Sequence, residues 1–164
     1  MTQAALEQVR ADDSKLAGEH LPPTNSATPP NRKNHRLTKK EMAAVRGIQR
    51  EVAENEGIVL GWCFINAQRA AMCASMYGCE LLYHEGFFHK PDERIKHAWN
   101  TLNGKLVDLS SPMPVEEVYR HPSFISAYET TGTYTGDQVG EAMLKSGGFY
   151  WFNDPDPTEV SMMP

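Results

Sequence analysis

The apolar residues of this 164-residue chain recur first at helical intervals and later in strand-like runs. A capping-box pair, Thr38 and Glu41, precedes the first helical pattern, and Gly57 ends it. A second helix is predicted from near Trp62 to Tyr77, because this stretch is rich in good helix formers. Its small residues indicate close packing against a sheet.

Strand-like segments follow the two helices. Residues 80–84 and 87–88 flank Glu85-Gly86, and residues 95–102 and 105–109 flank Asn103-Gly104, the strongest two-residue hairpin signal that a sequence carries. Helices followed by an antiparallel meander predict an α+β fold. Beyond residue 112 we expect helices at 115–120 and 136–146, and a strand or an aromatic plug at 149–152.

Composition divides the chain into three parts. Residues 1–37 are rich in proline and polar residues and poor in aliphatic ones, so burial cannot offset the entropy of ordering them. We therefore predict a flexible N-terminal arm at 1–37, one folded domain at 38–152 and a mobile C-terminal tail at 153–164. A partner-binding tail is the alternative interpretation of the arm.

Charge and cysteine usage exclude several classes of protein. A net charge of −5 argues against nucleic-acid binding, and no apolar run approaches the ~18–20 residues that a membrane span needs. Three cysteines without a C-x-x-C pair, and no visible secretory signal, predict a cytoplasmic protein without disulfides. No cofactor or metal is expected, since the close ligand pairs of structural zinc sites are absent from the sequence.

The predicted hairpin places a histidine beside an aspartate. With Asn103-Gly104 as the turn, Trp99 faces Asp108 and His97 faces Ser110, so all four side chains share one face of the sheet. His97 and Asp108 are then diagonal neighbours within hydrogen-bonding reach, and the carboxylate can orient the imidazole. The alternative is an ordinary His–Asp pair on the surface of the sheet. A one-residue change in the length of the turn would also put the two residues on opposite faces.

Cys63 is the best-placed nucleophile for such a pair. It stands at the predicted start of a helix, where unpaired backbone N–H groups and the helix dipole stabilise a thiolate and can bind an oxyanion. Cys73 and Cys79 lack such a position, and buried packing is the simpler interpretation of both. The same interpretation is open for Cys63 taken alone.

Secondary candidates surround these three residues. Trp62 and Asn66 flank the thiol and are candidates for oxyanion or substrate binding, although Asn66 can equally serve the helix locally. Trp99 shares the face of His97. Glu85 is a further candidate for lining the site, and turn chemistry explains the Glu85-Gly86 pair about as well.

Four motifs stand in order along the chain. They are Gly61-Trp62-Cys63-Phe64-Ile65-Asn66-Ala67, Tyr83-His84-Glu85-Gly86, His97-Ala98-Trp99-Asn100 and Gly104-Lys105-Leu106-Val107-Asp108-Leu109-Ser110. In this order they resemble the transglutaminase-like branch of the papain-like cysteine hydrolases, in particular its small bacterial and phage members. The resemblance covers about residues 57–112 and departs from the family where the last strand ends in Leu-Ser-Ser-Pro.

This resemblance implies a papain-like core, with a nucleophile-bearing helix packed on an antiparallel sheet. It implies a catalytic triad with Cys63 as nucleophile, His97 as general base and Asp108 as orienting acid. We therefore expect a cysteine-dependent acyl-transfer enzyme that acts on a protein, a peptide or a small amide, in the host cytoplasm if the chain is phage-encoded. The rival hypothesis is a non-catalytic binding protein, for example a phage-encoded modulator of a host protein.

Overall fold

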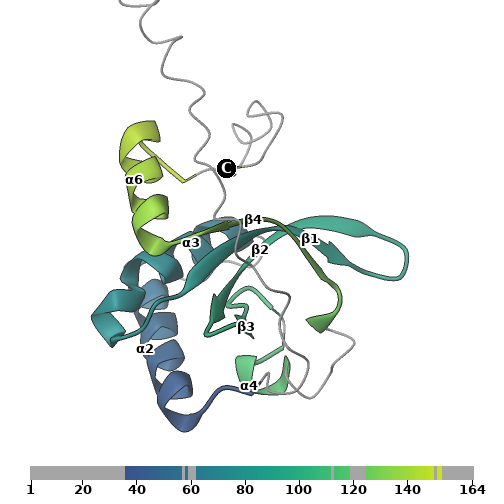
Figure 1. Ribbon diagram of the computed structural model, residues 1–164, viewed down its shortest axis with the longest axis horizontal. Helices are drawn as coiled ribbons and strands as arrows, with labels where there is room; N and C mark the ends of the chain where they lie inside the picture. The colour runs from purple at the N-terminus through teal and green to yellow at the C-terminus, as the bar shows by residue number, and fades with distance from the viewer. Residues whose placement is uncertain are drawn as a thin grey trace, which may run out of the picture.

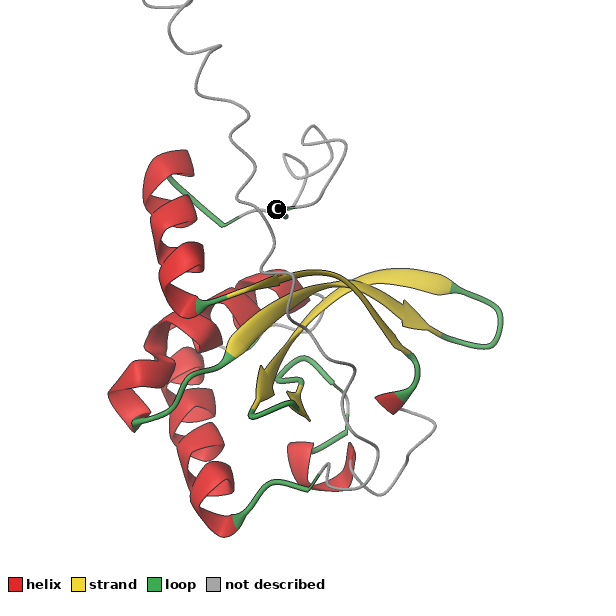
Figure 2. Ribbon diagram, viewed as in Figure 1, coloured by secondary structure: helices red, strands yellow, loops and turns green. Residues whose placement is uncertain are grey.

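A computed structural model describes residues 36–56, 58, 62–111, 113–118, 125–149 and 151–152. Within these residues, helices pack beside a four-stranded antiparallel sheet, which confirms the α+β prediction (Figure 2). Residues 1–35 of the arm predicted at 1–37, and the whole tail predicted at 153–164, lie outside the described residues. Leu37 is buried in the core, so the packed unit begins at least one residue before the predicted boundary at 38.

The sheet has the strand order β3-β2-β1-β4, so β1 and β2 are central in the part of the chain that the structure describes (Figure 1). Every neighbouring pair is antiparallel. The strands are β1 at Leu82–His89, β2 at Arg94–Leu102, β3 at Lys105–Val107 and β4 at Tyr128–Tyr134.

Helices α2, α3 and α6 gather at one side of the sheet, whereas α4 lies apart from them (Figure 1). Among them α3 is central, since it contacts β1 and β2 as well as α2 and α6. No helix among the described residues is long and apolar enough to cross a membrane. The helices are α2 at Lys39–Glu56, α3 at Cys63–Cys73 with the 3₁₀ turn η1 at Ala74–Tyr77, α4 at Val115–Val118 and α6 at Gly136–Ser146.

Small side chains let α3 lie close to the sheet, as the sequence predicts. Ala67 and Ala71 are buried against Tyr83 of β1 and Ala98 of β2. The amide of Asn100 on β2 donates a 2.9 Å hydrogen bond to the main-chain oxygen of Ala67, which ties the helix to the strand. These contacts fix the height of α3 over the sheet, and with it the position of its first residue, Cys63.

A bulge in the sheet corrects the sequence interpretation of Glu85-Gly86. We expected two short strands around a break, but β1 runs continuously from Leu82 to His89. The irregularity lies in its pairing with β4, whose register shifts between Glu85 and Gly86. A Cβ at Gly86 would lie 1.8 Å from the main-chain oxygen of Glu129, so only glycine permits this approach of β4.

The C-terminal part of the domain contains one element that the sequence analysis missed. Helix α6 has the predicted bounds, and Thr135 and Gln138 form a capping box at its start. The strand β4 was not predicted. Of the aromatic run at 149–152, Phe152 is buried and packs against Tyr83 and Tyr134, which favours the plug over the strand.

The predicted capping box at the start of α2 is present and has a second role. The Thr38 N–H donates to Glu41 Oε2 at 2.6 Å, and the Glu41 N–H donates to Thr38 Oγ1 at 3.2 Å. Glu41 also accepts hydrogen bonds from Lys105 Nζ at 2.7 Å and from Asn103 Nδ2 at 2.9 Å. One carboxylate therefore joins the first turn of α2 to the β2–β3 hairpin.

We predict that Glu41→Gln lowers the free energy of unfolding by about 1–2 kcal/mol, because it removes the charge from the cap and from the Lys105 pair. Burial opposes ionisation, but hydrogen bonds from Asn103, Lys105 and Thr38 lower the pKa of Glu41 to about 2. The stabilisation is thus complete above the ordinary pKa near 4.5 and is lost as the pH falls toward 2.

Thermal unfolding of both proteins between pH 7 and pH 2 measures this difference, which should shrink steadily below pH 4.5. The matched control is Glu54→Gln, an exposed position on the same helix, which should change little. An equal loss in both variants would contradict the prediction.

Candidate active site

The β2–β3 hairpin has the predicted register. Strand pairs run from Leu102 with Lys105 to Asn100 with Val107, and both turn residues, Asn103 and Gly104, have positive φ. The next residue pair in this register is Trp99 with Asp108. The hairpin therefore places His97 and Asp108 on one face, and His97 Nε2 lies 2.7 Å from Asp108 Oδ2, as the sequence predicts.

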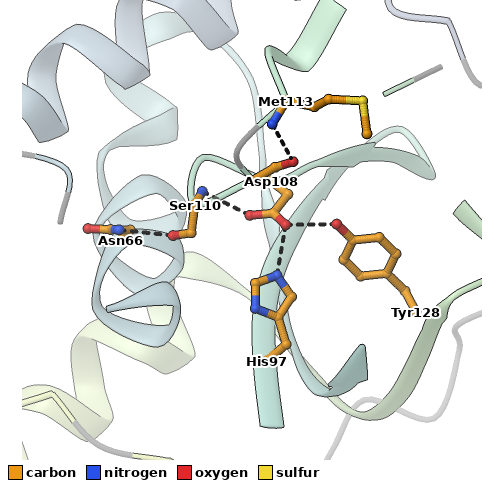
Figure 3. A network of polar contacts seen from close by, with 7 residues as sticks. Asn66, His97, Asp108, Ser110, Met113 and Tyr128 are labelled. Carbon is orange, nitrogen blue, oxygen red and sulfur yellow. Dashed lines mark hydrogen bonds and ion pairs between the residues drawn. The ribbon is translucent and has the colours of Figure 1, made fainter. Parts of the chain in front are cut away.

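Asp108 is a buried carboxylate surrounded by hydrogen-bond donors (Figure 3). Its Oδ1 accepts the Ser110 N–H at 2.9 Å, and its Oδ2 accepts both His97 Nε2 and the Tyr128 hydroxyl at 2.7 Å each. A buried charge is tolerated when it is paired and hydrogen-bonded. These three donors satisfy that requirement.

Cys63 is the first residue of α3, and its thiol lies close enough to His97 to help raise the pKa of the imidazole. Because Nε2 of the imidazole faces Asp108, the nitrogen left for the thiol is Nδ1. Strand β3 ends at Val107, before the position opposite His97, and the chain turns away at 109–110. Cys63, at the start of α3, therefore approaches His97 past the end of β3.

Two opposing effects act on the proton affinity of His97. Burial alone would lower the pKa of the imidazole. The hydrogen bonds and charges of Asp108 and Cys63 act the other way and raise it from 6.5 to about 9. At neutral pH His97 is therefore held as an imidazolium between a carboxylate and a thiol.

Aromatic rings surround the imidazole on its remaining sides. Trp99 stacks on His97 with ring centroids 6.1 Å apart, and Phe88 and Tyr128 approach at 6.1 and 5.7 Å. His84 in turn stacks on Trp99, with ring centroids 5.8 Å apart. Burial lowers the pKa of His84 to about 4, so this second histidine is neutral where His97 is charged.

Asn66, one of the secondary candidates, lies beside the site and fastens it. Its side chain is 1% exposed, and its Nδ2 donates a 2.9 Å hydrogen bond to Ser110 Oγ. Since the Ser110 N–H also contacts Asp108, Asn66 links α3 to the turn that carries the carboxylate (Figure 3). This bond joins residues far apart in the chain, so it differs from the local helix role that the sequence analysis left open for Asn66.

Of the other secondary candidates, two lie beside the triad and one does not. Trp99 lies against His97 as expected, and Trp62 is the half-buried N-cap residue of α3, directly before the thiol. The structure does not bring Glu85 to this group. It is fully buried on the opposite face of β1, where its Oε1 accepts hydrogen bonds from the Tyr83 hydroxyl at 2.9 Å and the Phe152 N–H at 2.7 Å.

Glu85 therefore holds the aromatic plug to the sheet. Turn chemistry does not explain it either, because the Glu85-Gly86 pair lies inside a strand. Strand alternation is the physical reason for its placement: His84 points to the face of Trp99 and His97, so Glu85 points away from it.

Tyr128 is the residue that sequence reasoning missed. It comes from β4, and its hydroxyl reaches the carboxylate that orients His97. The signal that could have found it is the segment Tyr128–Tyr134, in which aromatic and β-branched residues have the composition of a strand.

The two other cysteines occupy different surroundings. Cys73 and Cys79 are partly buried beside the core of α2 and the hairpin, and burial raises the pKa of both thiols. In the described part of the chain, no group of three or more histidine, cysteine, aspartate or glutamate side chains could hold a metal ion.

No protein family, curated protein or solved structure matches this chain. Its function is therefore inferred from the geometry of its own residues.

We predict that Asp108→Asn lowers the pKa of His97 from about 9 toward its ordinary value of 6.5, because the carboxylate charge is a main cause of the raised value. A ¹⁵N-histidine NMR titration of the folded protein measures this directly. The control is Glu129→Gln, which removes the carboxylate beside the exposed His89 and should leave His97 unchanged. A His97 titration unaffected by Asp108→Asn would contradict the assignment.

Proposed function

We propose that this chain is a cysteine-dependent acyl-transfer enzyme whose triad is Cys63, His97 and Asp108. The observation that carries the proposal is the position of His97, whose Nε2 is bonded to a buried carboxylate and whose pKa is also raised by the nearby thiol of Cys63. This order of nucleophile, base and orienting acid is the arrangement that activates cysteine for attack on a carbonyl. The resemblance to transglutaminase-like, papain-like enzymes supports the same assignment.

In the first half-reaction His97, as an imidazolium, already holds the proton of Cys63, and the thiolate attacks the carbonyl carbon of the substrate. A C–S bond forms, and the carbonyl electron pair moves onto oxygen. The imidazolium then donates its proton to the departing nitrogen as the C–N bond breaks, which leaves a thioester on Cys63. Asp108 keeps Nε2 occupied, so that Nδ1 faces the reacting atoms throughout.

The start of α3 supplies the groups that stabilise the oxyanion. The first hydrogen bond of the helix runs from the Asn66 N–H to the Trp62 oxygen at 3.0 Å, so the N–H groups before Asn66 have no acceptor within the helix. Among them, the N–H of Cys63 lies nearest to the nucleophile. A donor of this kind contributes about 3 kcal/mol to an acyl-transfer transition state.

In the second half-reaction a water molecule or an amine attacks the thioester, with His97 as the base. The C–S bond breaks, and the released thiolate is again paired with the protonated His97. Water yields hydrolysis of an amide, isopeptide or thioester, and an amine yields transfer. Trp62 and Trp99, which flank the triad, are the proposed substrate-contacting side chains, and a protein, a peptide or a small amide is the proposed substrate.

One observation favours a non-catalytic binding protein on the same scaffold. Cys63 is only 8% exposed, so little of the residue is open to a substrate in this conformation. A binding protein has no need for a reactive thiol. Thiol reactivity therefore separates the two functions.

We predict that iodoacetamide alkylates Cys63 of the full chain at pH 6.5 about tenfold or more faster than Cys73 or Cys79. The imidazolium of His97 can pair with a thiolate at Cys63, whereas burial raises the pKa of the other two thiols. Mass spectrometry of the alkylated peptides over time measures all three cysteines in one sample.

His97→Ala should remove this advantage of Cys63. The matched control is His89→Ala, which changes an exposed histidine on β1 and should leave the alkylation rates unaltered. If Cys63 reacts no faster than the other cysteines and does not respond to His97→Ala, the binding-protein function replaces the enzyme.

A further inference from the structure

We propose that Tyr128 is a positioning residue that weakens the hold of Asp108 on His97, by donating to the same carboxylate oxygen. The inference rests on the proposed function, in which His97 must both accept and release a proton. It adds a fourth side chain, from the opposite edge of the sheet, to the three of the triad.

The geometry of the shared oxygen supports this role. Figure 3 shows the Tyr128 hydroxyl and His97 Nε2 converging on Oδ2 of Asp108, each at 2.7 Å. The other oxygen, Oδ1, accepts the Ser110 N–H. Two donors on one oxygen divide its electron density, so each hydrogen bond is weaker than it would be alone.

The ring of Tyr128 is fixed by its surroundings. It packs edge-on against Trp99 and Phe88, with ring centroids 5.0 and 5.1 Å apart. Its strand is aligned by the bulge at Gly86, where β4 approaches β1 closely. The hydroxyl is thus held toward the carboxylate by packing and strand pairing.

The hydroxyl is a permanent donor. Burial, together with the charge and hydrogen bond of Asp108, raises the pKa of Tyr128 above its ordinary value. Tyr128 therefore neither accepts nor releases a proton in the working range, and its effect reaches the reaction only through Asp108.

The titratable groups that face His97 come from each element packed around it. They are Cys63 from α3, Asp108 after β3 and Tyr128 from β4. On β1, His84 lies behind Trp99 and is uncharged above a pKa of about 4. Removing the Tyr128 hydroxyl leaves Asp108 with fewer donors, so its bond to the imidazolium strengthens.

The consequence for the reaction follows from this bond. An imidazolium that is held too strongly donates its proton poorly to a leaving group. By sharing Oδ2, Tyr128 brings the acidity of His97 closer to the neutral range in which both half-reactions proceed.

The test is the titration of His97 by ¹⁵N-histidine NMR in full-length Cys63→Ala protein, in which the thiol cannot contribute. In this background Tyr128→Phe should move the titration of His97 upward by about 0.5 pH unit or more. General loosening of the site would move it the other way, toward the value of a solvated histidine. The sign of the shift therefore separates a positioning role from a structural one.

The matched control is Tyr134→Phe, the same substitution on the same strand, in the core cluster on the opposite face. It should leave the titration of His97 unchanged. A downward shift or no shift in Tyr128→Phe, or an equal upward shift in Tyr134→Phe, would overturn the inference. Because the thiol is absent here, these outcomes are independent of Cys63 alkylation, whose failure would remove the proposed function alone.

Discussion

The candidate site depends on one buried charge. Asp108 is 3% exposed, and a carboxylate at that depth is tolerated only if donors surround it. Its donors come from β2, from β4 and from the turn after β3. Three separate parts of the chain must therefore converge on two oxygen atoms, and this requirement fixes the sheet edges and the imidazole relative to one another.

Contacts along helix α3 fix its position relative to the sheet and to the turn that carries Asp108. Its alanines let it approach the sheet, Asn100 binds its backbone, and Asn66 fastens its first turn to Ser110. Cys63 is therefore held at the imidazole by contacts made along the helix and not by its own side chain alone. A position set by a rigid element is the kind of preorganisation that acyl transfer needs.

Local signals account for what the sequence predicted correctly. Asn103-Gly104 selects one turn geometry, and that geometry fixes the register that brings His97 to Asp108. Local signals could not predict the role of Tyr128, because that role depends on the pairing of β4 with β1, about forty residues away in the chain. Glu85 was misjudged for a related reason: Gly86 suggested a break, whereas a bulge keeps the strand alternation and turns Glu85 away.

The close approach at Gly86 gives main-chain geometry an influence on side-chain acidity. No residue with a Cβ fits there, and the strand that it admits carries the hydroxyl bonded to Asp108. The basicity of His97 is thus adjusted by how two strands pair, without an additional charged group. Proteins built on this scaffold could drift in their working pH through changes of strand spacing, while every polar residue of the site stayed the same.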